Sequence, residues 1–205
     1  DALGEACRAL AGLSRDPAGR ERCGEAGACR AVVRAAAASL PRVSSVGEAC
    51  LEAIAELATE CPDNAARLVH ARVTGVVLSA LRELPNNGGV QLQGLRCVAL
   101  LARGADGYAS GLGRAQACRV VLLCLRTALG RNASPHVLEA SLAATCALAR
   151  GDEANRRELA RSGACREVLH AMEASPTFFC CSRAGLAIHI ASHHITLVSR
   201  RPQRV

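Results

Sequence analysis

The chain has 205 residues, half of them hydrophobic, which supplies enough apolar side chain for one packed domain of ordinary size. Its formal net charge is +7, every basic residue is an Arg, and the aromatic residues are limited to one Tyr and two Phe. No apolar run reaches the roughly 18 residues of a membrane-spanning helix and no signal-peptide pattern is present, so the sequence argues against a membrane span.

The first two segments in chain order are residues 1–18 and 19–63. Residues 1–18 contain one predicted helix of a partial unit, and we expect further repeats or a partner to cover its open side. Residues 19–63 contain three predicted helices: a short one over AGRERCGE, a second after GACR, and a third within CLEAIAELA. Apolar residues at helical spacing mark the second and third helices, at Val32, Val33, Ala36 and Ala37 and at Ile54, Leu57 and Ala58.

Residues 64–107, 108–153 and 154–198 repeat this order of short, second and third helix. Turn-forming stretches with Pro, Gly and Asn separate the second helix from the third, as in PRVSSVG, PNNGG, GRNASP and ASPT. Asp63 and Asp152 are predicted to cap the short helices that follow them. We therefore expect a single repeat domain over residues 1–198.

The last residues carry the rare aromatic side chains and the end of the domain. Phe178 and Phe179 open the last predicted third helix, either as core and capping residues or as an apolar patch that meets a neighbouring protein. SRRPQRV (199–205) is a polar tail that ends the repeats.

Two independent series of positions share one period. Gly27, Arg72, Gln116 and Gly163 follow the short helices at spacings of 45, 44 and 47 residues. Leu13, Leu57, Leu101, Leu148 and Ile190 anchor the third helices at spacings of 44, 44, 47 and 42. Both series stretch to 47 at the same step. Such a period indicates stacked helical units, each of which buries too little apolar surface to fold alone.

The repeat resembles the armadillo repeat. ANRRELARSGACREVLHAM (154–172) is similar to the family signature N-x-x-x-(I/L)-x-x-x-G-(G/A)-I-P-x-L-V, and PAGRERCGEAGACRAVVRAA (17–36) is a second match. The resemblance covers about the whole chain and implies an all-α, right-handed α-solenoid of about four to five repeats. HEAT repeats are the near alternative, but their units lack the short first helix. The chain departs from the signature at Arg30, Arg119 and Arg166 in place of Pro and at Cys29, Cys118 and Cys165 in place of Ile.

The peptide-binding members of this family carry a Trp and an Asn four residues apart on their third helices. The Asn positions here are occupied by Gly12, Glu56, Leu100, Ala147 and His189. The Trp positions are occupied by Arg8, Glu52, Arg96, Ala143 and Gly185. The resemblance therefore does not extend to the ladder that clamps an extended peptide backbone, and nuclear-import cargo binding is unsupported.

Charged residues occupy several of these third-helix positions. Arg8, Glu52 and Arg96 are equivalent in successive units, so we expect them to line the concave face with alternating sign. One interpretation is a polar stripe, with Glu56 and His189, that docks a partner helix or tail. The other is an intramolecular ladder of exposed ion pairs, each worth about 0–1 kcal/mol. The polar-stripe hypothesis predicts that Glu52→Arg weakens partner binding more than folding.

The cysteines fit packing better than chemistry. Twelve Cys are scattered through apolar helical patterns without a CxxC pair, which predicts few or no disulfides and a reducing, intracellular and cytoplasmic compartment. The only local Cys/His concentration comprises Cys180, Cys181, His189, His193 and His194. His189 and His193 could share a metal with Cys181, but adjacent Cys pairs are poor metal spacing, and we predict no metal or other cofactor.

Catalytic patterns are missing from the sequence. It has no Gly-rich phosphate loop, GxSxG, HExxH or paired-carboxylate motif, and Cys29, Cys118 and Cys165 recur with the repeat instead of marking one unique site. A catalytic domain upstream would lie outside these residues, and the start at Asp1 instead of Met leads us to expect a piece of a longer protein.

The sequence therefore favours a non-enzymatic protein-interaction scaffold, a segment or subunit of a larger assembly. The range of the armadillo family adds cytoskeletal, ciliary or trafficking assemblies as possible settings. The alternative is a nucleic-acid or polyanion binder that uses the Arg-rich surface. It is weakened because Arg is interleaved with Glu along the chain and stacking aromatics are missing.

Overall fold

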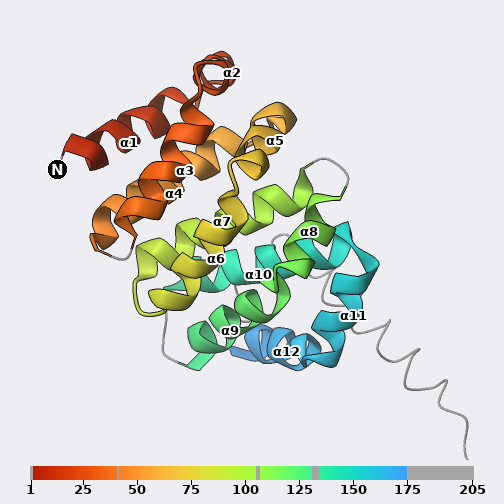
Figure 1. The fold of residues 1–205 in the computed structure, drawn as a ribbon. Helices are drawn as coiled ribbons and strands as arrows, with labels where there is room; N and C mark the ends of the chain where they lie inside the picture. Colours follow the sequence, from red (N-terminus) through yellow and green to blue (C-terminus); the bar gives the residue numbers. More distant parts are fainter. Residues whose placement is uncertain (1, 41, 105–106, 131–133, 175–205) are drawn as a thin grey trace, which may run out of the picture.

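The structure, a computed structural model, describes residues 2–40, 42–104, 107–130 and 134–174. These residues form twelve α-helices and, as far as they extend, no strand (Figure 1). The helices fall into three kinds that recur in order. The short helices are α2 (Pro17–Glu25), α5 (Pro62–His70), α8 (Tyr108–Arg114) and α11 (Glu153–Arg161). The second helices are α3 (Ala28–Ser39), α6 (Val73–Glu83), α9 (Ala117–Gly130) and α12 (Ala164–Ala174). The third helices are α1 (Ala2–Leu13), α4 (Ser44–Ala58), α7 (Gly88–Arg103) and α10 (Pro135–Gly151).

Successive third helices pack against one another, α1 on α4, α4 on α7 and α7 on α10. Second helices stack in the same order, and Figure 1 shows the units following one another from α1 to α12. This arrangement is the all-α solenoid that the period predicts. The short first helix is present in each of the four units that begin within the described residues, which separates the fold from the HEAT alternative.

A left-handed residue ends the turn between each short helix and the second helix that follows. Gly27, Arg72, Gln116 and Gly163 have φ of 86°, 63°, 66° and 89°. These are the four positions that the sequence alignment treats as equivalent, so its register is correct to the residue. Glycine adopts this conformation without strain, whereas Arg72 and Gln116 adopt it at a cost.

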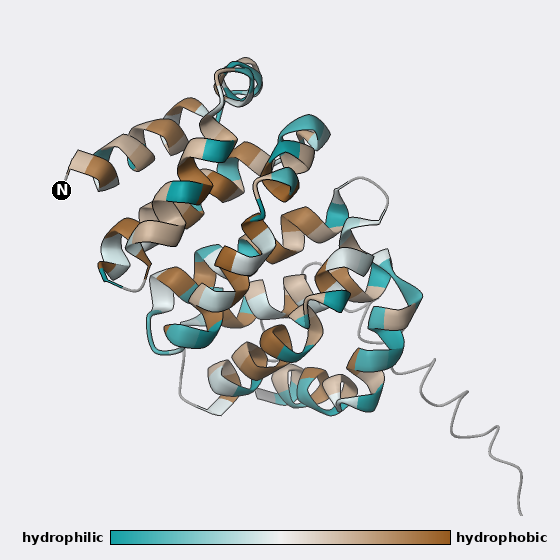
Figure 2. Ribbon diagram, in the orientation of Figure 1, coloured by the Kyte–Doolittle hydropathy of each residue, from teal (hydrophilic) through white to brown (hydrophobic). Residues whose placement is uncertain are grey.

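The core runs through the solenoid between the helix layers and contains mostly Leu, Val, Ala and Cys. Figure 2 shows apolar segments alternating with polar ones along the helices. The predicted anchors Leu57, Leu101 and Leu148 are at most 1% exposed. Leu13, the alignment anchor of the first unit, is 63% exposed. No helix of a preceding unit is present among the described residues to pack against α1.

Buried asparagines join the short helices of neighbouring units. Asn64 Nδ2 donates a hydrogen bond to the Arg20 carbonyl oxygen at 3.0 Å, and Asn155 Nδ2 donates to the Ala109 carbonyl oxygen at 2.7 Å. A Cβ at Gly24 would lie 1.7 Å from Asn64 Oδ1, and a Cβ at Gly113 would lie 1.7 Å from Asn155 Oδ1. Glycine is therefore required opposite each asparagine.

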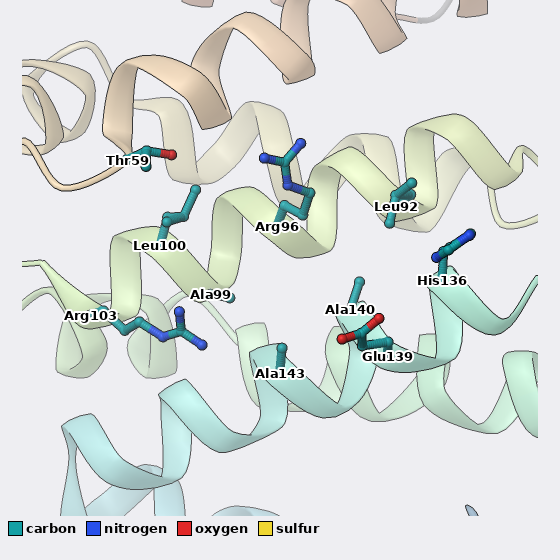
Figure 3. Close-up of a pocket in the computed structure, with 10 residues that line it drawn as sticks. All are labelled: Thr59, Leu92, Arg96, Ala99, Leu100, Arg103, His136, Glu139, Ala140 and Ala143. Carbon is teal, nitrogen blue, oxygen red and sulfur yellow. The ribbon is translucent and has the colours of Figure 1, made fainter. Parts of the chain in front are cut away.

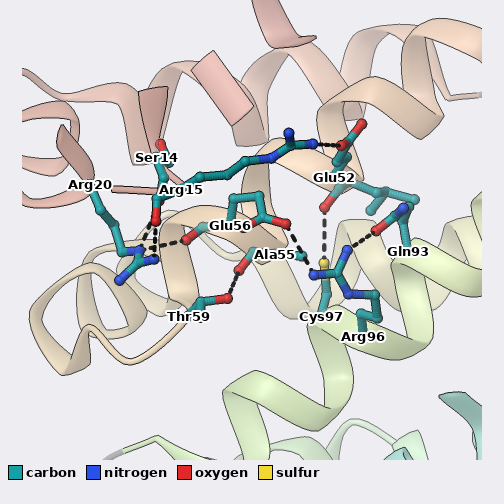
Figure 4. Close-up of polar contacts among 11 residues, drawn as sticks. Ser14, Arg15, Arg20, Glu52, Ala55, Glu56, Thr59, Gln93, Arg96 and Cys97 are labelled. Carbon is teal, nitrogen blue, oxygen red and sulfur yellow. Dashed lines mark hydrogen bonds and ion pairs between the residues drawn. The ribbon is translucent and has the colours of Figure 1, made fainter. Parts of the chain in front are cut away.

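A buried arginine closes the carboxyl ends of the first two third helices (Figure 4). Arg20 is 6% exposed, and its Nε donates to the carbonyl oxygens of Ser14 and Glu56, both at 3.0 Å. Its Nη2 donates to the Arg15 carbonyl oxygen at 3.2 Å. A cation at this place supplies donors to the Ser14 and Arg15 carbonyls, adds a second donor to the Glu56 carbonyl beside the Thr59 N–H, and lies at the negative end of both helix dipoles.

The two predicted helix caps have different outcomes. Asp152 caps α11, because its carboxylate accepts a hydrogen bond from the Asn155 N–H at 2.9 Å. The prediction for Asp63 is wrong: Cys61 is the N-cap of α5, and Asp63 lies in the first turn of the helix. Pro62 explains the difference, because its fixed φ suits the first helical position and starts α5 before Asp63.

Candidate functional site

A groove of about 410 Å³ lies along the third helices α7 and α10, beside the carboxyl end of α4 (Figure 3). Its apolar lining comes from small and aliphatic side chains of the two helices, Leu92, Ala99, Leu100, Ala140 and Ala143. Thr59 closes it on the α4 side. These residues face the groove because α7 and α10 pack side by side and their lining positions recur at helical spacing.

Four ionisable side chains surround this lining. Figure 3 shows Arg96 and Arg103 on α7 and His136 and Glu139 on α10. Arg96 Nη2 is 3.1 Å from Glu56 Oε1, an ion pair that joins α7 to α4. Arg103, His136 and Glu139 are exposed and have no hydrogen bond or ion pair within the described residues. The groove therefore combines an aliphatic floor with two guanidinium groups, of which Arg96 is already paired with Glu56 and Arg103 is not.

The groove coincides with the third-helix positions that the alignment singles out. Arg96 and Ala143 occupy two Trp positions of the armadillo ladder, and Leu100 occupies an Asn position. Sequence reasoning named Arg96 but missed Arg103, His136 and Glu139. A helical signal for them exists, because Arg103 follows Arg96 by two turns, and Glu139 precedes Ala143 by one.

The predicted stripe of Arg8, Glu52 and Arg96 is not a direct ladder of these three residues. Arg8 pairs with Glu5 within α1, and Arg15 Nη2 lies 3.5 Å from Glu52 Oε1 (Figure 4). Successive third helices are thus bridged by Arg15–Glu52 and Glu56–Arg96, pairs that are offset along the helices. His189 lies outside the described residues, as do Phe178, Phe179 and the candidate metal ligands Cys180, Cys181, His193 and His194.

Most of the described cysteines are buried in the core. Burial raises the pKa of Cys97, Cys118 and Cys124 to about 12. Cys7 Sγ and Cys50 Sγ lie 3.4 Å apart, and burial raises the pKa of Cys50 to about 12. A thiol with a raised pKa stays protonated near neutral pH and is a poor nucleophile, which supports the packing interpretation.

Alkylation of the folded protein tests this interpretation. With iodoacetamide at pH 8, we expect the half-buried Cys23 and Cys61 to be modified at least tenfold faster than Cys97, because Cys97 is buried and protonated. Peptide mass spectrometry over time measures each rate. Rates within twofold for all three thiols would contradict the structure, and the same reaction in urea provides the unprotected reference.

No group of His, Cys, Asp and Glu suited to a metal ion occurs among the residues that the structure places. Within the same part of the chain, every helix is too short or too polar to cross a membrane.

No protein-family model and no curated protein matches the chain. Solved structures do match: an engineered protein has a TM-score of 0.73 at 18% identity over 96% of this chain. A designed armadillo repeat protein has a TM-score of 0.69 at 21% identity over 94% of this chain. The chain has the armadillo-repeat fold. It spans 44% of the length of the engineered protein and 74% of the designed armadillo protein.

Another solved structure that matches the chain contains a bound peptide. This designed armadillo repeat protein was solved in complex with the peptide (KR)4 and has a TM-score of 0.71 at 19% identity, covering 95% of this chain and 74% of its own. At these identities the likeness establishes the armadillo architecture, and the ligand belongs to the neighbour.

Proposed function

We propose that this armadillo-fold chain is a non-enzymatic protein-interaction scaffold that binds an extended acidic and aliphatic segment of a partner along α7 and α10. The observation that carries the proposal is the groove itself, whose floor is aliphatic and whose rim holds two guanidinium groups. Arg103 has no partner among the described residues, Arg96 is paired with Glu56, and Glu139 is the one carboxylate of the lining. Aliphatic side chains of the ligand would bury apolar surface on Leu92 and Leu100, and its carboxylates would meet the guanidinium groups.

Charge separates this ligand from that of the designed neighbour. The neighbour binds the peptide (KR)4, in which every residue is basic. Such a peptide would meet like charges at Arg103 and Arg96 in this chain, and like charges across an interface suppress binding. Backbone clamping is also weaker here, because Leu100 replaces an Asn that would hydrogen-bond the ligand.

The setting of this scaffold belongs to the same proposal. We place it as a segment or subunit of a larger assembly, cytoskeletal, ciliary or trafficking, because solenoids of this fold present long surfaces to several partners. An intracellular, cytoplasmic location is part of the proposal, and it is supported by buried thiols such as Cys97 and Cys118, which suit a reducing compartment.

Fluorescence anisotropy with two labelled peptides tests the groove. We expect a peptide that alternates Leu and Glu to bind at least tenfold more tightly than one that alternates Leu and Lys. Arg103→Glu should weaken binding of the Leu/Glu peptide about tenfold, because it replaces an attraction at the rim by a repulsion. The matched control is Arg119→Glu, the same change at an exposed position of α9 outside the groove.

Two results would refute this function. One is equal affinity for the two peptides, since the rim charge would then not select the ligand. The other is an equal loss of affinity in Arg103→Glu and Arg119→Glu, which would indicate attraction to net charge alone. Circular dichroism of each variant verifies that the helices are retained.

A further inference from the structure

A second hollow, of about 580 Å³, lies on another part of the surface. It is lined by six residues of α3, of α5 and of the turn into α6: Arg30, Arg34, Arg67, His70, Ala71 and Arg72. Four of the six are arginines and none is acidic. No third helix contributes to it, so it is separate from the groove along α7 and α10.

These arginine side chains make almost no hydrogen bonds or ion pairs within the described residues. Arg30, Arg34 and Arg72 are exposed, and their side chains make no hydrogen bond or ion pair there. Arg67 Nη1 alone donates to Asn64 Oδ1, at 2.9 Å. The guanidinium groups therefore remain available to a ligand.

The corresponding surface between α9 and α12 is neutralised. Arg126 Nε and Arg166 Nη2 each lie 3.0 Å from Glu167 Oε1. Burial alone would raise the pKa of Glu167, but hydrogen bonds from Arg166 and Arg126 hold it below its ordinary value. Glu167 thus pairs with two arginines at that surface, whereas no acidic residue lines the α3–α5 hollow.

The cluster is also unique within a repetitive scaffold. The alignment places Leu123 at the position of Arg34 and Glu158 at the position of Arg67. Arg72 has φ of 63° at a position where two of the other three units have glycine. Like charges held together cost stability, and an arginine adopts the left-handed conformation of this turn less readily than the glycine of two other units.

We propose that this arginine cluster, made of Arg30, Arg34, Arg67 and Arg72, binds a phosphorylated segment of a partner protein. Guanidinium groups form paired hydrogen bonds with phosphate oxygens, and several converging arginines are the usual means of recognising phosphorylated peptides. Arg30 lies in the first turn of α3 and Arg72 directly precedes α6, whereas Arg67 lies in the last turn of α5, so helix dipoles of both signs reach the hollow and the arginine side chains supply the attraction.

The lining argues against two other polyanions. A single-stranded nucleic acid is normally held by stacking on aromatic side chains, and none lines the hollow. A membrane surface is normally engaged by basic residues beside apolar ones that insert between the lipids, and Ala71 is the only apolar residue here. A compact group of guanidinium donors suits the clustered charge of a phosphorylated segment.

Anisotropy with a fluorescein-labelled Gly/Ser peptide that carries two phosphoserines tests this site. We expect the phosphorylated peptide to bind at least tenfold more tightly than its unphosphorylated form and to weaken as salt rises. Arg30→Glu and Arg34→Glu should each reduce its affinity about tenfold. Arg119→Glu, at the position equivalent to Arg30 in another unit, is the matched control and should leave the affinity unchanged.

Arg72→Gly separates a binding role from a structural one. It removes one guanidinium and relieves a left-handed residue, so we expect weaker binding of the phosphorylated peptide together with a higher melting temperature. Arg103→Glu in the groove should not affect this peptide, which keeps the two sites distinguishable.

Three outcomes would overturn the proposal. The first is no measurable preference for the phosphorylated peptide. The second is equal affinity of Arg30→Glu and Arg119→Glu for it. The third is tighter binding, lost in Arg30→Glu, to single-stranded oligodeoxythymidine or to phosphatidylcholine vesicles containing phosphatidylinositol bisphosphate, which would assign the cluster to nucleic acid or to a lipid surface.

Discussion

Arg20→Met is expected to lower the free energy of unfolding by about 3 kcal/mol, because buried carbonyl groups lose a charged donor. Arg20 is 6% exposed and donates to the carbonyl oxygens of Ser14, Arg15 and Glu56. Methionine fills much of the same volume but donates nothing, so the carbonyls of Ser14 and Arg15 lose their donor at the end of α1, and the Glu56 carbonyl keeps only the Thr59 N–H at 3.3 Å. Urea unfolding followed by circular dichroism measures the change.

Two further variants separate charge from geometry at this site. Arg22→Met changes an exposed arginine of the same helix that has no side-chain partner among the described residues, and it should alter stability by no more than about 0.5 kcal/mol. Arg20→Lys keeps the charge but loses the planar fork that reaches three carbonyls, so we expect an intermediate loss. Equal stability of the Arg20→Met and Arg22→Met proteins would show that the buried contacts contribute nothing.

The solenoid could be predicted from sequence because the residues at its turns and in its core recur with one period. Gly27 and Gly163 mark left-handed turns directly, and the alignment carries Arg72 and Gln116 into the same positions. The core positions follow from helical spacing, as Leu57 and Leu101 show. Leu13 is the exception, because burial depends on a neighbouring unit and not on the helix alone.

Contacts between units were harder to predict because they depend on how far one helix is displaced along the next. The alignment makes Arg8 and Glu52 equivalent, but the ion pair joins Glu52 to Arg15. The asparagine contacts could have been predicted from the sequence, since Asn64 and Asn155 occupy equivalent positions in their units. The arginine cluster could not have been predicted in this way, because Arg34 and Arg67 come together only when two units stack.

Gly24→Ala is the second large effect, and we expect it to lower the free energy of unfolding by about 2–3 kcal/mol. The added Cβ would lie 1.7 Å from Asn64 Oδ1 and 2.6 Å from its Cγ, so the amide must move. Moving it breaks the hydrogen bond from Asn64 Nδ2 to the Arg20 carbonyl oxygen inside the core. Urea unfolding again measures the loss, and hydrogen exchange in α2 and α5 should accelerate before that in α9.

Gly75→Ala is the matched control, because Gly75 lies within α6 and a Cβ there meets no atom within 4 Å. Alanine has the higher helix propensity, so this change should raise stability by about 0.5–1 kcal/mol. A double variant locates the cause of the loss at Gly24. Asn64→Ala removes the atoms that the new Cβ would strike, so Gly24→Ala should cost less in that background than in the native one. A cost that is the same in both backgrounds would mean that Asn64 is not the obstacle to a Cβ at position 24.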